Sequence, residues 1–408
     1  MTEPIPTATA TPTALPAQTT HDDGPPDPPA ARPAYGEKVE WRNYTLLLVL
    51  AVIWFVFQLL TDGLFLTQRN LGLLALQSTI VSLAAISAVM LIVTRNFDVS
   101  VGSAVALVGV VLAMLTVRAG WPVLPAILVA MLCAVLMGAW QGFWVARVGI
   151  PSFIVTLAGM LYFRGLSLII PDGETIAPLP GALTNFATGY LTAAYSVILI
   201  LLALGGYLAY QLRTVRRAVR LGLADDVRRP FARRAVPAIV AAAAGIYIGE
   251  SIGIPLLVIL LGVCTLVAEL LMRRTRYGAK LYAIGGNPEA ARLAGINVES
   301  AVFRNFLIAG VAYGITGIAL TARVSGAVGG SAGLFLELDA IAAAIIGGTS
   351  LAGGRGRILG ALLGALLMGS LNNGMSLMNV STFYQETARG MVLLVAVAID
   401  QLSRRRAA

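Results

Sequence analysis

The 408-residue chain is 58% hydrophobic, and only 12% of its residues are charged. A soluble domain carries about 25% charged residues, so this composition cannot cover a water-facing surface and excludes a chain built from soluble globular domains. A lipid-embedded chain needs about 20 apolar residues for each span. Residues 41–402 hold about twelve such spans and leave no room for a large extramembrane domain.

Histidine, cysteine and glycine patterns exclude several chemistries. The only histidine, His21, lies in the polar N-terminal region, so the rest of the chain has no histidine for a metal site or a catalytic base. Cys133 and Cys264 stand singly in apolar runs, which is typical neither of a disulfide framework nor of a zinc site. No G-x-x-x-x-G-K-[ST] motif occurs, so the chain lacks a phosphate-binding loop for ATP. We expect a chain that is not an enzyme and holds no metal or cofactor.

Residues 1–40 form a separate region, rich in proline and threonine and poor in large apolar side chains. Such a composition cannot bury a core and predicts a disordered tail. It does not resemble a signal peptide, because no apolar stretch follows a basic start. At the other end, residues 403–408 predict a short basic tail.

Apolar runs separated by short polar breaks predict an all-α polytopic fold. About 10–12 transmembrane helices are expected, and the runs at 235–249 and 337–348 are short enough to be half-helices or re-entrant segments. The predicted spans are 43–61, 71–93, 101–117, 123–145, 151–170, 191–210, 235–249, 253–271, 302–321, 337–348, 358–376 and 382–401.

The distribution of arginine and lysine predicts the orientation of these spans. With the N-terminus in the cytoplasm, one set of connections carries 22 basic residues and the opposite set carries three. The positive-inside rule then places both termini, a basic loop at 211–234 and the segment 273–304 in the cytoplasm. The net charge of +9 is thereby explained by topology and contact with anionic membrane lipid, not by nucleic-acid binding.

The cytoplasmic segment 273–304 contains the pattern of a short, well-capped helix. Asn287 suits the N-cap, Pro288 the first helical position, and Glu289 the first turn, where the helix dipole favours an acid. Gly295 suits the end of the helix. This pattern predicts either a rigid element that a cytosolic partner contacts or an amphipathic connector lying on lipid headgroups. The body of this helix is Ala290, Ala291, Arg292, Leu293 and Ala294.

Three ordered motifs resemble the permeases of ATP-binding-cassette importers. Glu-Ala-Ala at 289–291 with Gly295 resembles their EAA…G signature, and the whole string 285–296 is similar to the monosaccharide branch, the xylose, ribose and galactose permeases. The stretch 97–103, Phe-Asp-Val-Ser-Val-Gly-Ser, resembles the I-D-L-S-V-G-S motif of that branch. The stretch 337–354 resembles its E-L-D-A-I-A-A…G-G-T-S-L-x-G-G block. Together the resemblance covers roughly residues 41–402.

Two features depart from the common pattern of that branch. Arg95-Asn96 stands where the family often has two glycines. The basic stretch 211–234, with the apolar pair that follows it, is absent from the shorter ribose-type members and is similar to the longer xylose-type permeases. The second departure favours xylose as the substrate.

The resemblance implies the importer permease fold in a bacterial plasma membrane, with a cytoplasmic coupling helix. It also implies a homodimer joined to cytosolic ATPase subunits, which bind ATP and Mg, and an external sugar-binding protein that delivers xylose or a related pentose. Alternatives are a branched-chain amino-acid or nucleoside importer permease of the same superfamily, and an ion-coupled secondary transporter. The last would need acids at mid-membrane. The residues expected to couple to the ATPase are Asn287, Glu289, Ala290, Ala291, Arg292 and Gly295.

Polar residues in the predicted spans are candidates for a translocation path. Asp98 follows the second span, and Ser100, Gly102 and Ser103 open the third, where small residues permit either close packing or a broken helix that lines a cavity. The alternative for Asp98 is a helix N-cap with no role in passage. Arg164 needs a partner or a watery cavity, unless it snorkels to the interface. The pair Asn372-Asn373 could bind sugar hydroxyls or join neighbouring helices by hydrogen bonds.

Overall fold

The structure, a computed structural model, describes residues 41–221, 228–250 and 253–405. Within these ranges the chain is helical, and its only β-type pairings are two isolated bridges. The all-α prediction is therefore confirmed. The expected tail at 1–40, the middle of the expected basic loop at 222–227 and the last three residues of the expected C-terminal tail lie outside the described residues.

Each predicted span coincides with a helix, and eight helices of the described part are long and apolar enough to cross a membrane. These eight are α2 (Gln68–Val93), α3 (Val101–Ala113) continued by a π-helical turn at Met114–Arg118, α4 (Val123–Phe143) continued by another at Trp144–Val148, α5 (Ser152–Ile169), α7 (Ala193–Arg220), α9 (Leu256–Arg274), α12 (Val298–Val324) and α14 (Ile358–Leu377). The remaining helices are α1 (Trp41–Leu60), α6 (Gly181–Thr188), α8 (Arg228–Gly249), α10 (Arg276–Gly286), α11 (Pro288–Leu293), α13 (Leu336–Ile346) and α15 (Thr382–Arg405).

The two short predicted spans have different outcomes. The helix α13 has 11 residues, which at 1.5 Å each rise about 16 Å and cannot cross a hydrocarbon core of about 30 Å. It is a half-helix, as the sequence indicated. The helix α8 has 22 residues, because helix-forming alanine and arginine extend it back to Arg228. With α7 continuing to Arg220, the described residues of the basic stretch 211–234 are helical apart from Leu221.

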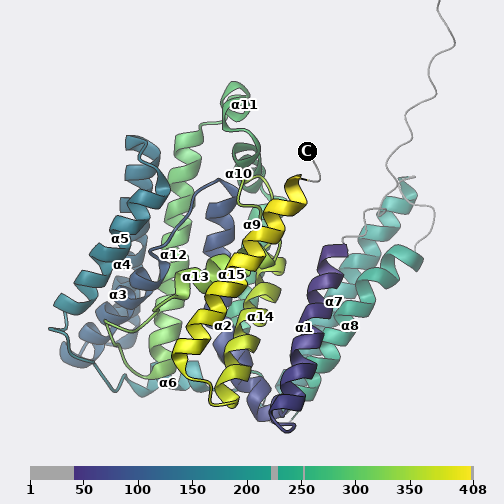
Figure 1. The fold of residues 1–408 in the computed structure, drawn as a ribbon, viewed down its shortest axis with the longest axis horizontal. Helices are drawn as coiled ribbons and strands as arrows, with labels where there is room; N and C mark the ends of the chain where they lie inside the picture. The colour runs from purple at the N-terminus through teal and green to yellow at the C-terminus, as the bar shows by residue number, and fades with distance from the viewer. Residues whose placement is uncertain (1–40, 222–227, 251–252, 406–408) are drawn as a thin grey trace, which may run out of the picture.

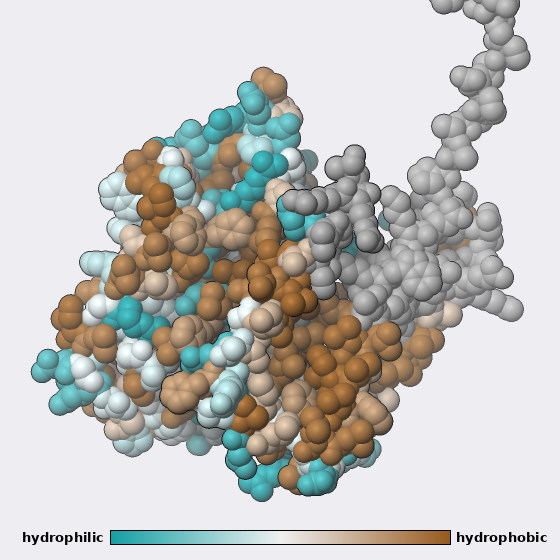
Figure 2. Space-filling view, in the orientation of Figure 1, coloured by the Kyte–Doolittle hydropathy of each residue, from teal (hydrophilic) through white to brown (hydrophobic). Residues whose placement is uncertain are grey.

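Figure 1 shows two ends of the helical bundle. The helix α11, the end of α15 and the facing ends of α7 and α8 point one way, and α6 and the turn between α1 and α2 lie at the opposite end. Figure 2 shows hydrophilic surface at the end that carries α10 and α11, and hydrophobic surface along the flank of the bundle. This distribution suits a protein whose flanks face lipid and whose ends face water.

The core forms around α2 and α12, and small residues allow the closest approach. The helix α2 is buried from Ser78 to Val93 without interruption. Where α12 crosses α4, a methyl group built on Gly138 would lie 3.0 Å from the Cα of Gly310, and one built on Gly310 would lie 3.0 Å from the Cα of Val135. Small residues at such crossings let helix backbones pack closely in membranes.

Two helices begin inside the bundle and meet at their N-terminal ends. The segment 94–100 precedes α3, and the segment 325–335 precedes α13. A methyl group on Gly102 would overlap both the Gly333 carbonyl oxygen and the Glu337 carboxyl. The acid therefore lies beside the N-terminal end of α3, where the helix dipole favours negative charge.

The crossing of α4 and α12 gives a stability prediction. Gly310→Leu would push the two helices apart, and overpacking of this kind costs about 1–3 kcal/mol. We expect detergent-solubilised Gly310→Leu protein to melt at a lower temperature than the wild type. Gly165→Leu is the matched control, because no atom lies within 4 Å of a methyl group built there. Equal melting temperatures for the two variants would contradict the prediction.

Candidate functional site

The segment from α10 to α12 is built from capped helices in close sequence. The Asn287 side chain accepts hydrogen bonds from the backbone N–H groups of Glu289 and Ala290, each at 3.0 Å. At the other end of α11, Gly295 has φ 79°, and the N–H of Ile296 donates to the Ala291 carbonyl at 3.0 Å. These bonds satisfy both helix ends. The predicted N-cap and glycine stop are thus confirmed, and the ends of the six-residue helix are fixed.

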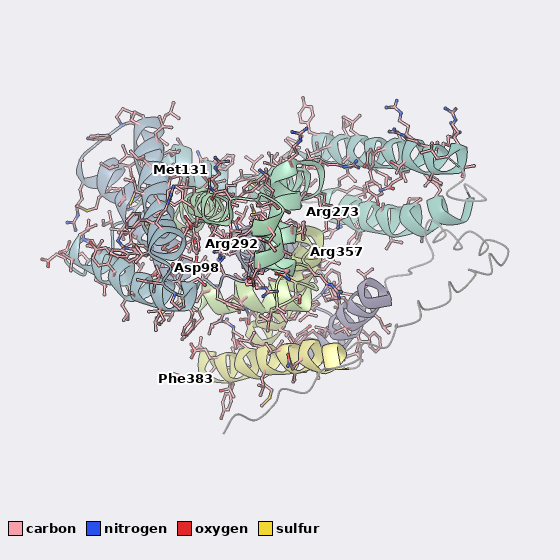
Figure 3. All side chains as sticks on the ribbon, turned by 90° about the horizontal axis from the view of Figure 1, so that it is seen from above. Asp98, Met131, Arg273, Arg292, Arg357 and Phe383 are labelled. Atoms are coloured by element: carbon pink, nitrogen blue, oxygen red, sulfur yellow. The ribbon has the colours of Figure 1, made fainter. Side chains whose placement is uncertain are left out.

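One of the six predicted coupling residues is buried, and the other five lie on exposed surface. Ala291 is buried and packs against the core of the protein. The other five are exposed: Asn287, Glu289, Ala290, Arg292 and Gly295. Leu293, at 87% exposure, presents an apolar side chain beside them. Seen from this end of the bundle, Arg292 lies near the centre, while α7, α8 and α15 lie at the edges (Figure 3).

The segment 273–304, called the coupling segment here after its predicted role, also contacts the connection between α13 and α14. The Tyr282 hydroxyl donates to the Gly356 carbonyl at 2.9 Å. Burial raises the pKa of the Tyr282 phenol, so it remains a neutral hydrogen-bond donor. The Gly354 N–H donates to the Val93 carbonyl at the end of α2, also at 2.9 Å. The ends of α2, α10 and the segment 347–357 therefore form one junction.

Asp98 forms the centre of a buried polar cluster. One carboxyl oxygen accepts from the backbone N–H and the hydroxyl of Ser100, at 2.8 and 2.7 Å. The other accepts from the Tyr313 hydroxyl on α12, and Gln141 on α4 donates to the Ser100 hydroxyl. Asp98 is 3% exposed, and the other three side chains of the cluster are fully buried. These bonds tie the start of α3 to α4 and α12.

The candidate path residues at the start of α3 are enclosed by this arrangement. Ser103 donates to the Ser100 carbonyl at 2.8 Å and is buried. The side chains of Asp98, Ser100 and Ser103 have little or no exposed surface within one copy of the chain. Their role in passage stays a prediction, and the geometry observed here is that of groups that position α3.

The segment 94–100 is hydrogen-bonded along its length by α5. The N–H of Phe97 donates to the Ser152 hydroxyl at 3.0 Å, and the N–H of Val99 donates to the Thr156 hydroxyl at 3.3 Å. Asn305 on α12 donates to the Thr94 hydroxyl at 3.2 Å, at the start of the segment, and to the Met90 carbonyl in the last turn of α2 at 2.8 Å. Because non-helical backbone at membrane depth has no water to bond, these side chains supply the partners it needs.

Arg164 has a partner inside the protein. Its guanidinium donates to the carbonyls of Gly329 and Ala332, at 2.8 and 2.9 Å, and the Ser167 hydroxyl donates to the same Gly329 carbonyl. The arginine thereby binds the segment 325–335, which leads into α13. Of the two interpretations offered by the sequence, this geometry favours a buried partner over snorkelling to the interface.

The asparagine pair on α14 joins helices. Asn373 and Asn70 on α2 exchange two amide hydrogen bonds, at 2.8 and 3.0 Å. The Asn372 oxygen accepts from Arg389 on α15 at 2.8 Å. A guanidinium nitrogen of Arg389 lies 4.0 Å from a carboxyl oxygen of Asp339 on α13. In this structure the amides are occupied by helix–helix contacts, and binding of sugar hydroxyls stays a prediction.

The sequence analysis missed Tyr313, Gln141 and Asn305, which complete these contacts. Each is a polar residue in an otherwise apolar span and is fully buried. Polar side chains in such a place face the bundle interior, so this signal was present in the sequence. The contacts that these side chains make could not be read from the sequence, because the contacting residues are far apart in it: Asp98 and Tyr313 are separated by 215 positions.

The cluster around Asp98 gives a second prediction. Tyr313→Phe removes the hydroxyl that donates to the buried carboxyl, and a buried polar group left without its partner costs about 1–3 kcal/mol. We expect a lower melting temperature for the solubilised variant. Tyr384→Phe, on α15, is the control, because that side chain is 72% exposed. If Tyr313→Phe melted with the wild type, the hydrogen bond would not hold α3 and α12 together.

Comparison with known proteins agrees with the motifs. Residues 70–397 match the family described as branched-chain amino acid transport system, permease component. The chain is 42% identical over 364 residues to the xylose transport system permease protein XylH of Escherichia coli strain K12, covering 89% of this chain and 92% of that protein. The XylH protein of Haemophilus influenzae is 39% identical over 373 residues, or 91% and 99% of the two chains.

A more distant relative is the ribose import permease protein RbsC of E. coli strain K12, 33% identical over 362 residues, which cover 89% of this chain and 94% of RbsC. No solved structure matches the chain significantly. The family match covers most of the chain, the relatives are aligned over nearly their whole length, and eight described helices suit a membrane. The chain is a multi-pass membrane protein and belongs to the branched-chain amino acid transport system permease family.

Proposed function

We propose that this chain is the membrane-spanning subunit of an ATP-driven, binding-protein-dependent importer of xylose or a related pentose in the bacterial inner membrane. The observation that carries the proposal is the 42% identity to a xylose transport permease over 89% of the chain. In this proposal two copies form a homodimer, two cytosolic ATPase subunits bind ATP and Mg, and an external protein delivers the sugar.

The exposed face of α11 supports a contact with the ATPase. A helix whose ends are both capped moves as one body when it is pushed. Its exposed acid, base and leucine offer a mixed polar and apolar surface, and hydrophilic surface surrounds them in Figure 2. We therefore assign the coupling role to Asn287, Glu289, Ala290, Arg292 and Gly295, with Ala291 anchoring the helix to the core.

The family description favours a second candidate, the import of a branched-chain amino acid. The two substrates differ in chemistry, because an amino acid carries two charges that need charged or strongly polar partners. The named relatives transport xylose or ribose by their descriptions. For this reason we prefer the sugar, and a direct uptake measurement separates the two.

The proposal predicts a specific loss at Glu289. In proteoliposomes holding the chain, its ATPase subunits and its binding protein, labelled xylose should accumulate on addition of ATP, and leucine should not compete. Glu289→Lys places a cation at the N-terminus of α11, against the helix dipole. We expect at least about tenfold lower uptake and weaker co-purification of the ATPase, since a loss of about 1.4 kcal/mol in binding is tenfold.

Glu250→Lys is the matched control, because it reverses the charge of an exposed acid that directly follows α8, outside the segment 273–304. Uptake through the control should stay within about twofold of the wild type. Normal uptake by Glu289→Lys would contradict the coupling role of α11. Uptake of leucine without uptake of xylose would favour the second candidate.

The proposed orientation gives another prediction. In a chain with Cys133 and Cys264 replaced by alanine, Ala294→Cys should resist an impermeant thiol reagent in intact cells, and Thr188→Cys should react. Both positions are exposed, one next to α11 and one on α6 at the opposite end of the bundle. Both should react after lysis. The reverse pattern in intact cells would place α11 outside and overturn the orientation.

A further inference from the structure

Arg95 forms a bridge between the end of α2 and the coupling segment. It is the first residue after Thr94, the C-cap of α2. Its Nε donates to the Gly285 carbonyl at 2.8 Å, and a terminal nitrogen donates to the Gly286 carbonyl at 2.7 Å. These carbonyls end α10, where the helix dipole favours a cation. One guanidinium therefore holds the last two residues of α10.

The backbone segments at this junction are in close contact. A methyl group on Gly285 would overlap the Val93 carbonyl oxygen and the Gly354 nitrogen. Another on Gly353 would lie 2.9 Å from the Gly285 carbonyl oxygen. Glycines permit this close approach of three segments. A displacement at the end of α10 consequently reaches the backbone at Val93 and Arg95 directly.

The conformation of Arg95 indicates that its side chain is needed. Its φ is 63°, in the left-handed region that a residue with a Cβ adopts at a cost and glycine adopts freely. An arginine at such a position is favoured only if its side chain contributes something that glycine lacks. The contribution visible here is the pair of hydrogen bonds to α10, which Arg's planar fork can make together.

Two parts of the proposed machine lie on either side of this bridge. On one side, Asn287 follows Gly286 at once and caps α11. On the other, Asp98 follows Arg95 by three residues and fixes the start of α3 through Ser100. We propose that Arg95 is a positioning residue that transmits movement of the coupling segment to the segment 94–100 and the start of α3. This proposal rests on the proposed function, because it requires an ATPase that moves α11.

The test compares two substitutions at Arg95 with one control. Arg95→Gly keeps the left-handed backbone and removes the guanidinium, so it isolates the side chain. Arg95→Lys keeps the charge but replaces the two-pronged contact by a single ammonium. The control is Arg147→Ala, at an exposed arginine in the turn that ends α4. All are studied as the full chain assembled with its ATPase subunits in lipid.

The first readout is hydrogen exchange of backbone amides with and without a non-hydrolysable ATP analogue. In the wild type and in Arg147→Ala, nucleotide should change exchange both at 285–296 and at 96–103. In Arg95→Gly the change at 285–296 should persist, and the change at 96–103 should be lost. A merely structural loss would alter exchange equally with and without nucleotide. This readout needs no sugar.

The second readout is the ratio of sugar taken up to ATP hydrolysed. Couplings between sites commonly amount to fivefold or more, so we expect this ratio to fall at least about fivefold in Arg95→Gly, with Arg95→Lys in between. ATPase co-purification should be unchanged. An unaltered ratio together with a nucleotide response at 96–103 in Arg95→Gly would overturn the proposal. A wild-type complex that responds to nucleotide but imports no pentose would count against the proposed function alone, since hydrogen exchange would still decide the role of Arg95.

Discussion

The need to satisfy backbone polar groups without water governs this fold. A chain in lipid can leave helical geometry only where protein groups replace the lost hydrogen bonds. It does so at 94–100, where Ser152 and Thr156 of α5 bond the backbone, and at 325–335, where Arg164 holds the carbonyls. The same helix, α5, supplies both sets of partners. Both interruptions, before α3 and before the half-helix α13, therefore receive hydrogen-bond partners from α5.

This constraint explains why the polar side chains of the interior are positioned as they are. Three pairs join neighbouring helices: Asp98 with Tyr313, Asn70 with Asn373, and Arg389 with Asn372. In lipid the flanks of a helix gain little from apolar packing alone, so small residues and polar pairs specify which helices touch. Residues that the sequence suggested as lining a path thus serve, in a single copy, to fix the geometry of the helices around it.

The sequence could predict the helices and the caps, because both depend on nearby residues. Apolar runs located the spans, and Asn287, Pro288 and Gly295 located α11. The partners of Asp98 and Arg164 could not be predicted, because lipid-facing and buried faces are equally apolar and the pattern does not tell how each helix is turned. The short helices α6 and α10 were missed for a related reason, since neither has a long apolar run. Arg95 was noticed only as a departure from two glycines, and its hydrogen bonds to α10 required the fold.

The position of Tyr313 connects the two ends of this arrangement. The helix α12 starts at Val298, close after α11, with its first turn capped by Asn297. Tyr313 lies 15 residues along it, a rise of about 22 Å at 1.5 Å per residue, so it is well inside the bundle. If α11 is displaced, α12 carries the movement to the Asp98 carboxyl from one side, and Arg95 carries it through 94–100 from the other. The proposed coupling therefore has two routes to the same carboxyl, one through Tyr313 and one through 94–100, and that carboxyl fixes the first residues of α3 through Ser100.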